Sequence, residues 1–193
     1  MMSEWHHCIV SYIDLIGIKD LLIARKSGAI DMMEGLHQVV HKQFSNSMHY
    51  HECAYSWNDS VILLAYLDKH PANYESIMKE VNQLKQDINT ICNSYAICVK
   101  GMAIPAFLGF SGEVILGDGS NQPRHTYIRT SSMALANCFA IEEHLGKKHN
   151  KPWYVDSRIV RYIDTHQAYE KDKVAMLPDM TERTIHIYNG DLW

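Results

Sequence analysis

A pair of strand-length segments, joined by a short polar turn, lies in the middle of the sequence between helical segments. The strands are expected over residues 50–56 and 61–67, and the turn between them is Trp57-Asn58-Asp59-Ser60. A polar turn between two apolar runs predicts an antiparallel hairpin. Because helical segments surround this hairpin, the pattern favours an α+β fold with a mainly antiparallel sheet and helices packed on one of its faces.

The other segments fill in this α+β order. The clearest helix, over residues 73–95, carries an apolar stripe that includes Val81 and Leu84. Further helices are expected over residues 15–26, 30–44, 131–145 and 158–165. Further strands are expected over residues 5–14, 97–108, 113–116, 153–155 and 184–188. We interpret residues 1–193 as one domain with its core at about 5–160, followed by C-terminal strands and a helix.

Composition narrows the range of partners. Hydrophobic residues make up 47% of the chain and charged residues 21%, which is typical of a folded globular protein and not of a disordered one. The formal net charge is -4, and the basic residues are scattered. Because a nucleic-acid-binding surface needs a clustered positive excess, we expect no nucleic-acid partner.

The sequence also indicates where the protein works. We find neither a long apolar run that would cross a membrane nor a secretory signal at the N-terminus. The 5 cysteines are odd in number and form no C-x-x-C pair, which favours a reducing compartment. We therefore expect a cytoplasmic protein with no membrane partner.

Two acids occupy informative positions. Asp14 ends the first expected strand, and Asp59 lies in the hairpin turn. If these strands are neighbours, both carboxylates lie at the same edge of the sheet and can share Mg²⁺ or Mn²⁺, which prefer oxygen ligands. Two carboxylates that hold two metal ions are typical of phosphoryl transfer. The alternatives are an ordinary strand-ending acid with an ordinary turn acid, or an unrelated α+β enzyme that uses the pair on another phosphate substrate.

The residues around these acids resemble a known family. Tyr12-Ile13-Asp14-Leu15-Ile16-Gly17-Ile18 is similar to the Phe-x-Asp-Ile-x-Gly-Phe motif of class III nucleotide cyclases. Trp57-Asn58-Asp59-Ser60 resembles the turn of their central hairpin. The stretch that contains Gly101, Gly112 and Gly117, followed by a helix ending at Glu142-Glu143, resembles a later segment of the family. The resemblance covers about residues 5–160 and implies the ferredoxin-like class III cyclase fold.

The resemblance also implies a mechanism. Asp14 and Asp59 would hold two Mg²⁺ or Mn²⁺ ions together with the Leu15 carbonyl. One ion would activate the ribose 3′-hydroxyl and the other would steady the triphosphate. The Leu15-Ile16-Gly17 turn would present amide groups to the phosphates. Family sites form between two copies of the domain, so the resemblance implies a homodimer with two shared sites.

The positions that read the base depart from the adenylate cyclase pattern. The adenine-reading Lys and Asp of that pattern fall on Tyr55 and Arg129. Arginine only donates hydrogen bonds, so Arg129 suits a base edge rich in acceptors, and a bulky Tyr55 shrinks the pocket toward a one-ring base. This pair resembles the pyrimidine cyclases of the Pycsar antiphage system. It implies a uridylate or cytidylate cyclase whose cUMP or cCMP product activates a separate defence effector. The alternative is a strand tyrosine and a solvated arginine without that role.

A second departure concerns the transition state. The Asn and Arg of the family helix fall on Ala136 and Ala140, and Asn137 is one residue out of register. A cation must still offset charge on the phosphates. Arg124 is our catalytic candidate, with His125 and Lys100 as alternatives. If none of them reaches the site, the chain is a catalytically silent cyclase-like module that binds nucleotide or protein.

Overall fold

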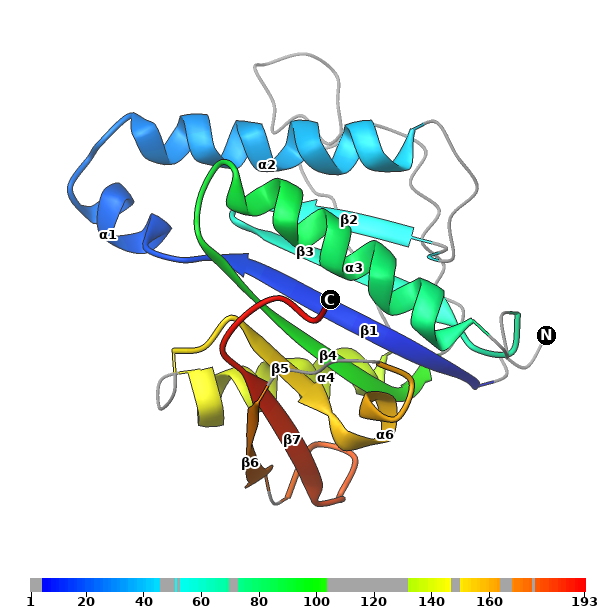
Figure 1. The fold of residues 1–193 in the computed structure, drawn as a ribbon. Coiled ribbons are helices and arrows are strands. Elements are labelled where there is room, and N and C mark those ends of the chain that lie inside the picture. The colour runs from blue at the N-terminus through cyan, green and yellow to red at the C-terminus, as the bar shows by residue number, and fades with distance from the viewer. Residues whose placement is uncertain are drawn as a thin grey trace, which may run out of the picture.

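A single sheet organises the protein in the computed structural model (Figure 1). The structure describes residues 5–45, 51, 53–69, 73–103, 132–146, 150–163, 168–174 and 176–193. Within them the strands are β1 (His6–Leu15), β2 (Cys53–Trp57), β3 (Ser60–Tyr66), β4 (Ser94–Ala103), β5 (Trp153–Asp156), β6 (Tyr169–Val174) and β7 (Arg183–Tyr188). Their order is β2-β3-β1-β4-β5-β7-β6, and only the β4–β5 pair is parallel. The prediction of a mainly antiparallel sheet with a hairpin, β2–β3, is confirmed.

Strand β1 lies between β3 and β4 and is buried on both faces. Ile9 and Ile13 point into one apolar core, while Val10 and Tyr12 point into another on the opposite face. Successive side chains of a strand alternate between faces, so Asp14 lies on the same face as Tyr12. The Asp14 side chain therefore lies on the face of the sheet that carries Val10 and Tyr12.

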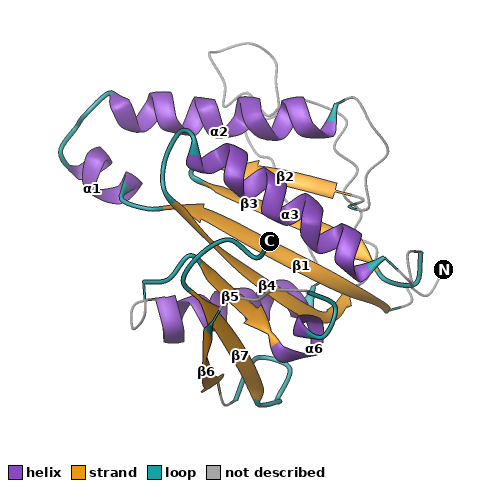
Figure 2. Cartoon of the chain, viewed as in Figure 1, coloured by secondary structure: helices purple, strands orange, loops and turns teal. Residues whose placement is uncertain are grey.

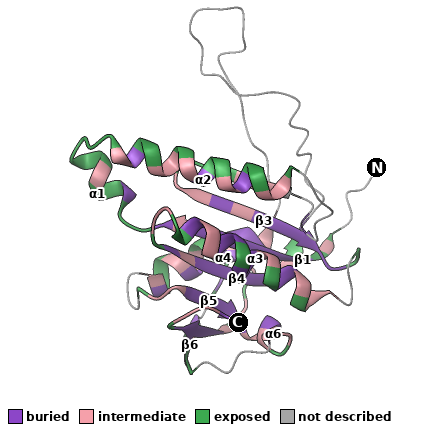
Figure 3. Ribbon diagram, turned by 45° about the horizontal axis from the view of Figure 1, so that its top comes forward, coloured by how far each residue is buried: buried purple, intermediate pink, exposed green. Residues whose placement is uncertain are grey.

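Helices cover both faces of this sheet. They are α1 (Ile18–Ile23), α2 (Gly28–Phe44), α3 (Tyr74–Asn89), α4 (Met133–Ile141), the π-helical turn η1 (Glu142–Gly146) and α6 (Ser157–Val160). Figure 2 shows α2 and α3 on one side of the sheet and α4 on the other. Figure 3 shows buried residues on the strands between these layers. The expectation of helices on one face is therefore wrong, because β1 is apolar on both faces and α4 covers the second core.

Three helices are shorter than expected. The chain stays in β1 through Leu15, and Gly17 adopts a left-handed conformation with φ of 88° before α1 begins. Glycine adopts this conformation without steric strain. Helix α3 ends at Asn89, whose side-chain oxygen accepts hydrogen bonds from the Ser94 backbone nitrogen and hydroxyl at 3.0 and 2.8 Å. The expected helix over residues 158–165 ends at Val160.

One strand was absent from the expectation. Strand β6 has the sequence Tyr-Glu-Lys-Asp-Lys-Val, is mostly exposed, and forms an edge of the sheet. Charged side chains are common on edge strands because they discourage pairing with other chains, and they hide the apolar alternation that reveals a strand. The expected strand over residues 113–116 and the end of the one over 97–108 lie outside the described residues. In the described part, no helix combines the length and apolar character needed to cross a membrane.

The contact between α4 and β4 generates a stability prediction. A Cβ atom at Gly101 would lie 2.7 Å from the Ala134 Cβ and 3.0 Å from the Ala134 Cα. These atoms cannot rotate away, so we predict that Gly101→Ala lowers the free energy of unfolding by about 1–3 kcal/mol, measured by urea denaturation. The control is Gly28→Ala, where a Cβ would meet nothing within 4 Å. A Gly101→Ala protein as stable as the wild type would contradict this packing.

Candidate active site

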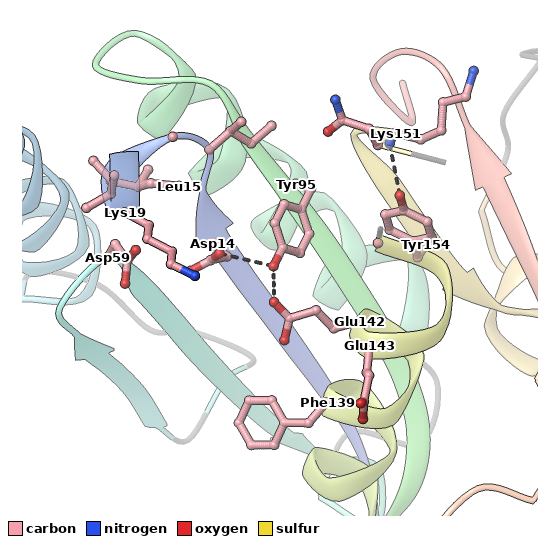
Figure 4. A pocket seen from close by; sticks show the side chains of 15 residues that line it. Asp14, Leu15, Lys19, Asp59, Tyr95, Phe139, Glu142, Glu143, Lys151 and Tyr154 are labelled. Carbon is pink, nitrogen blue, oxygen red and sulfur yellow. Dashed lines mark hydrogen bonds between the residues drawn. The ribbon is translucent and has the colours of Figure 1, made fainter. Parts of the chain in front are cut away.

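The end of β1 and the hairpin turn are joined by a backbone hydrogen bond. The Leu15 N–H donates to the Asp59 carbonyl at 3.0 Å, and Asp14 pairs with Ser60 in the β1–β3 ladder. Asn58 takes the left-handed conformation in the turn, with φ of 52°, which asparagine tolerates. As a result, Asp14 and Asp59 line the same pocket, which has a volume of about 470 Å³ (Figure 4).

Acidic residues dominate this pocket. Its charged lining consists of four carboxylates and two lysines, with three aromatic rings beside them. The charged and aromatic lining residues are Asp14, Asp59, Glu142, Glu143, Lys19, Lys151, Tyr95, Phe139 and Tyr154. They come from the end of β1, the start of α1, the hairpin turn, the start of β4, the α4–η1 helix and the chain near β5. The pocket therefore joins segments that are far apart in the sequence.

Tyr95 connects two of the carboxylates. It stands opposite Asp14 in the β1–β4 ladder, and its hydroxyl lies 3.0 Å from the Asp14 Oδ2. The same hydroxyl contacts the Glu142 Oε1 (Figure 4). A phenol has one proton to donate, so it cannot fully satisfy both carboxylates when both are ionised. Burial and, second, the hydrogen bond to Glu142 raise the pKa of Tyr95 far above its ordinary value. The phenol therefore stays protonated.

Asp14 is the most perturbed acid of the pocket. Burial, followed by repulsion from Asp59, raises the pKa of Asp14 from 3.8 to about 7, and repulsion from Glu142 adds to this. The hydrogen bond from Tyr95 acts in the opposite direction. Below about pH 7 Asp14 therefore carries a proton that a bound cation would displace, because a cation favours the ionised carboxylate.

The oxygen donors present fit a hard divalent cation. Asp14 and Asp59 supply carboxylates, and the mutual repulsion that raises the Asp14 pKa would be relieved by a cation between them. No group of three or more His, Cys, Asp or Glu side chains in the described ranges is arranged to hold a metal. The protein would thus contribute two carboxylates and the Leu15 carbonyl, which leaves the other coordination positions to substrate and water, as is common for Mg²⁺.

The Leu15-Ile16-Gly17 turn contributes fewer amide groups than expected. The Leu15 N–H is bonded to the Asp59 carbonyl, and the Ile16 N–H donates to the Asn93 carbonyl at 2.8 Å. These two amides are therefore not available to phosphate oxygens. No described residue accepts a hydrogen bond from the Gly17 amide. Of the three amides of this turn, only that of Gly17 is therefore available to phosphate oxygens.

The other expected site residues lie away from this pocket or outside the described residues. Tyr55 pairs with Ile62, which packs in the same core as Tyr12, so Tyr55 is on the pocket's side of the sheet but does not line the pocket. Arg124, His125 and Arg129 lie outside the described residues.

Helix α4 and Lys100 do not supply a cation to the pocket. Lys100 donates to the Tyr74 hydroxyl at 2.8 Å, at the start of α3, so it lies on the opposite face of the sheet from Asp14. Asn137 is fully buried and does not line the pocket. Ala136 and Ala140 do not line it either.

Among the pocket residues that the sequence did not indicate, Tyr95, Glu142 and Lys19 matter most for the chemistry. Tyr95 was assigned to the end of a helix, so its pairing with Asp14 was not expected. Glu142 begins a π-helical turn, a feature found often at functional sites. Lys19 lies two residues after Gly17, and a basic residue next to the Asp14 motif was the signal available for it.

The raised pKa of Asp14 generates a stability prediction. Asp14 titrates at about 7 in the folded protein and near 3.8 when unfolded, so its contribution to the free energy of unfolding decreases as pH rises from about 4 to 7. Asn cannot ionise, so Asp14→Asn should be more stable than the wild type at pH 8 by roughly 1–3 kcal/mol, and by less at pH 5. Chemical denaturation without divalent ions measures both values. An equal difference at the two pH values would contradict the assignment.

Comparisons with known proteins place this geometry in a recognised fold. No protein-family model and no curated protein matches the sequence. Among solved structures, a bacterial light-regulated adenylyl cyclase matches with a TM-score of 0.60 and 9% identity, over 96% of this chain and 91% of that one. The adenylyl cyclase CyaB from P. aeruginosa matches with a TM-score of 0.56 and 7% identity, over 98% and 97%. A guanylyl cyclase matches with a TM-score of 0.52 and 10% identity, over 99% and 95%.

The likeness extends over nearly the whole of each of these three chains, although few residues are identical. The three chains therefore share the overall fold of this protein. The expected fold is confirmed: the chain has the α+β fold of the class III nucleotide cyclases.

Proposed function

We propose that this protein is a nucleotide cyclase that converts UTP, or CTP, to the 3′,5′-cyclic nucleotide and pyrophosphate. The observation that carries the proposal is the meeting of Asp14 and Asp59 in one pocket of a fold shared with solved adenylyl and guanylyl cyclases. A volume of about 470 Å³ is in the range of small-molecule sites.

In this reaction the ribose 3′-oxygen forms a bond to the α-phosphorus while the bond from that phosphorus to the β-phosphate oxygen breaks. The hydroxyl proton is released and pyrophosphate leaves. Asp14 and Asp59 would hold two Mg²⁺ or Mn²⁺ ions, which supply a lowered pKa for the hydroxyl and neutralise phosphate charge. The Tyr95 hydroxyl, 3.0 Å from the Asp14 Oδ2, would keep that carboxylate oriented.

The base would be read by a second copy of the chain. Tyr55 lies on the pocket's side of the sheet without lining the pocket of its own chain, which supports a homodimer in which Tyr55 and Arg129 of one copy meet the acids of the other. The Tyr55 and Arg129 pair also underlies the pyrimidine preference and the proposed role in antiphage signalling through a cyclic nucleotide and a separate effector.

A silent module that binds nucleotide or protein is the second candidate. It is favoured by Ala136 and Ala140, which place no charge on α4 where the family carries Asn and Arg. It is opposed by the two site acids, because repulsion between them raises the Asp14 pKa and a module without cation chemistry has no need for that arrangement.

Product formation by the wild type separates the two candidates, and removal of Asp59 tests the site. We predict that Asp59→Ala lowers cyclic-nucleotide formation at least about a hundredfold, because one of two acidic ligands is lost. The fold should be kept, since substitutions of partly exposed turn residues usually have small effects on stability. Product chromatography after incubation with each of the four nucleoside triphosphates and Mn²⁺ gives the rate. The matched control is Asp20→Ala, an exposed acid that does not line the pocket. Near wild-type turnover by Asp59→Ala would exclude this site.

The base-reading residues generate a second prediction. UTP should react fastest, CTP next and ATP slowest, because Arg129 presents only donors and the amine of adenine would face it donor to donor. Such a mismatch costs about 1–3 kcal/mol, or roughly 5- to 150-fold in selectivity. Initial rates with each nucleotide measure the order, and Arg129→Ala should reduce the preference for UTP. Faster turnover of ATP would remove the pyrimidine assignment and leave the cyclase assignment. Nucleotide binding without any product would favour the silent module.

A further inference from the structure

Lys19 is the one cation of the pocket's described lining that has no acidic partner. Lys151, the other lysine, has its Nζ 3.9 Å from the Glu170 Oε1. Lys19 is exposed and forms no ion pair within 4.0 Å with any described acid, although Asp14 and Asp59 line the same pocket. Figure 4 shows its side chain reaching from the start of α1 toward Asp14, between the two acids.

The backbone fixes the position of Lys19. Gly17 turns the chain with a φ of 88°, and Ile18, the first residue of α1, is 1% exposed in the core beside β1. Successive residues of a helix point about 100° apart, so a buried Ile18 directs the next side chain out of the core. In this structure that direction leads into the pocket. The glycine turn after Asp14 therefore also determines where Lys19 lies.

The charge of the pocket gives this lysine a role. Four carboxylates line it, and positions 136 and 140 of α4 carry alanine. A polyphosphate chain that enters the pocket would meet acidic side chains. Even with divalent cations on Asp14 and Asp59, few cationic side chains would be left to neutralise its terminal phosphate. A lysine ammonium is a compact point charge that suits phosphate oxygens. Lys19 is the pocket cation that the described residues offer to such a ligand.

We propose that Lys19 binds the phosphate chain of the substrate, from the same subunit that supplies Asp14 and Asp59. The proposal deepens the proposed function and rests on it for the identity of the substrate. Lys19 on α1 would then neutralise part of the phosphate charge, because Ala136 and Ala140 on α4 cannot do so. Binding of a polyphosphate would then need no residue from a second copy, whereas reading of the base would.

The test compares Lys19→Gln with the wild type in two measurements. The first is binding of inorganic tripolyphosphate in the presence of Mn²⁺, by isothermal titration calorimetry. We expect Lys19→Gln to bind at least about tenfold more weakly, because a charge-assisted hydrogen bond is lost, and Lys19→Arg to retain most of the affinity. The second is kcat/KM for UTP, which should fall at least as far. Lys26→Gln, an exposed lysine that does not line the pocket, is the matched control and should equal the wild type in both.

The outcomes separate this proposal from the proposed function. A wild type that forms no cyclic nucleotide but binds tripolyphosphate through Lys19 would refute the cyclase and support the phosphate contact. An active wild type whose Lys19→Gln variant binds and reacts equally well would overturn the contact and leave the cyclase. Unchanged tripolyphosphate binding with tighter Mn²⁺ binding in Lys19→Gln would show that Lys19 acts as a counter-ion to the carboxylates, which also overturns it. Failure of the wild type to bind tripolyphosphate would overturn it as well.

Discussion

The register of β1 between its two antiparallel neighbours determines where the chemistry of this protein lies. Asp14 is paired with Ser60 on one side and with Tyr95 on the other, and the next residue bonds to the Asp59 carbonyl. A slip of one residue would turn Asp14 toward α2 and α3, because side chains alternate between the faces of a strand. The apolar residues of β1, buried in two separate cores, resist such a slip. Packing of the whole sheet thus holds the site.

The same arrangement makes the site unfavourable without a ligand. Three acids, Asp14, Asp59 and Glu142, are near enough that two of them raise the pKa of the third, and burial adds to the effect. Natural sites often accept a loss of stability for function. The loss arises because ionising the half-buried Asp14 costs free energy, and either a proton or a bound cation would relieve that cost. Metal binding and proton release are therefore coupled in the proposed enzyme.

The pocket is also asymmetric in its charges. Tyr95, Glu142 and Glu143 close one side with acid and phenol groups, while Lys19 stands at the start of α1 near Asp14 and Asp59. The π-helical turn that begins at Glu142 extends α4 beyond its regular end, and Glu142 reaches the Tyr95 hydroxyl. In the proposed enzyme, the polyphosphate and its cations would bind on the side of Lys19 and the two aspartates. In the proposed homodimer, the face that bears Tyr55 would meet the second copy of the chain.

The sequence by itself determined the α+β class, the hairpin and the two acids, because apolar periodicity and turn chemistry are local properties. It placed Asp14 at a strand end and Asp59 in a turn, and the structure puts both there. It did not show β6, whose charged residues hide their alternation, or the end of α3 at Asn89, which a side-chain bond to Ser94 sets. Only the tertiary structure decided that α4 covers the second face and that Tyr95, Glu142 and Lys19 meet at the acids. These contacts join residues far apart along the chain, and their geometry depends on strand pairing and packing that no local pattern encodes.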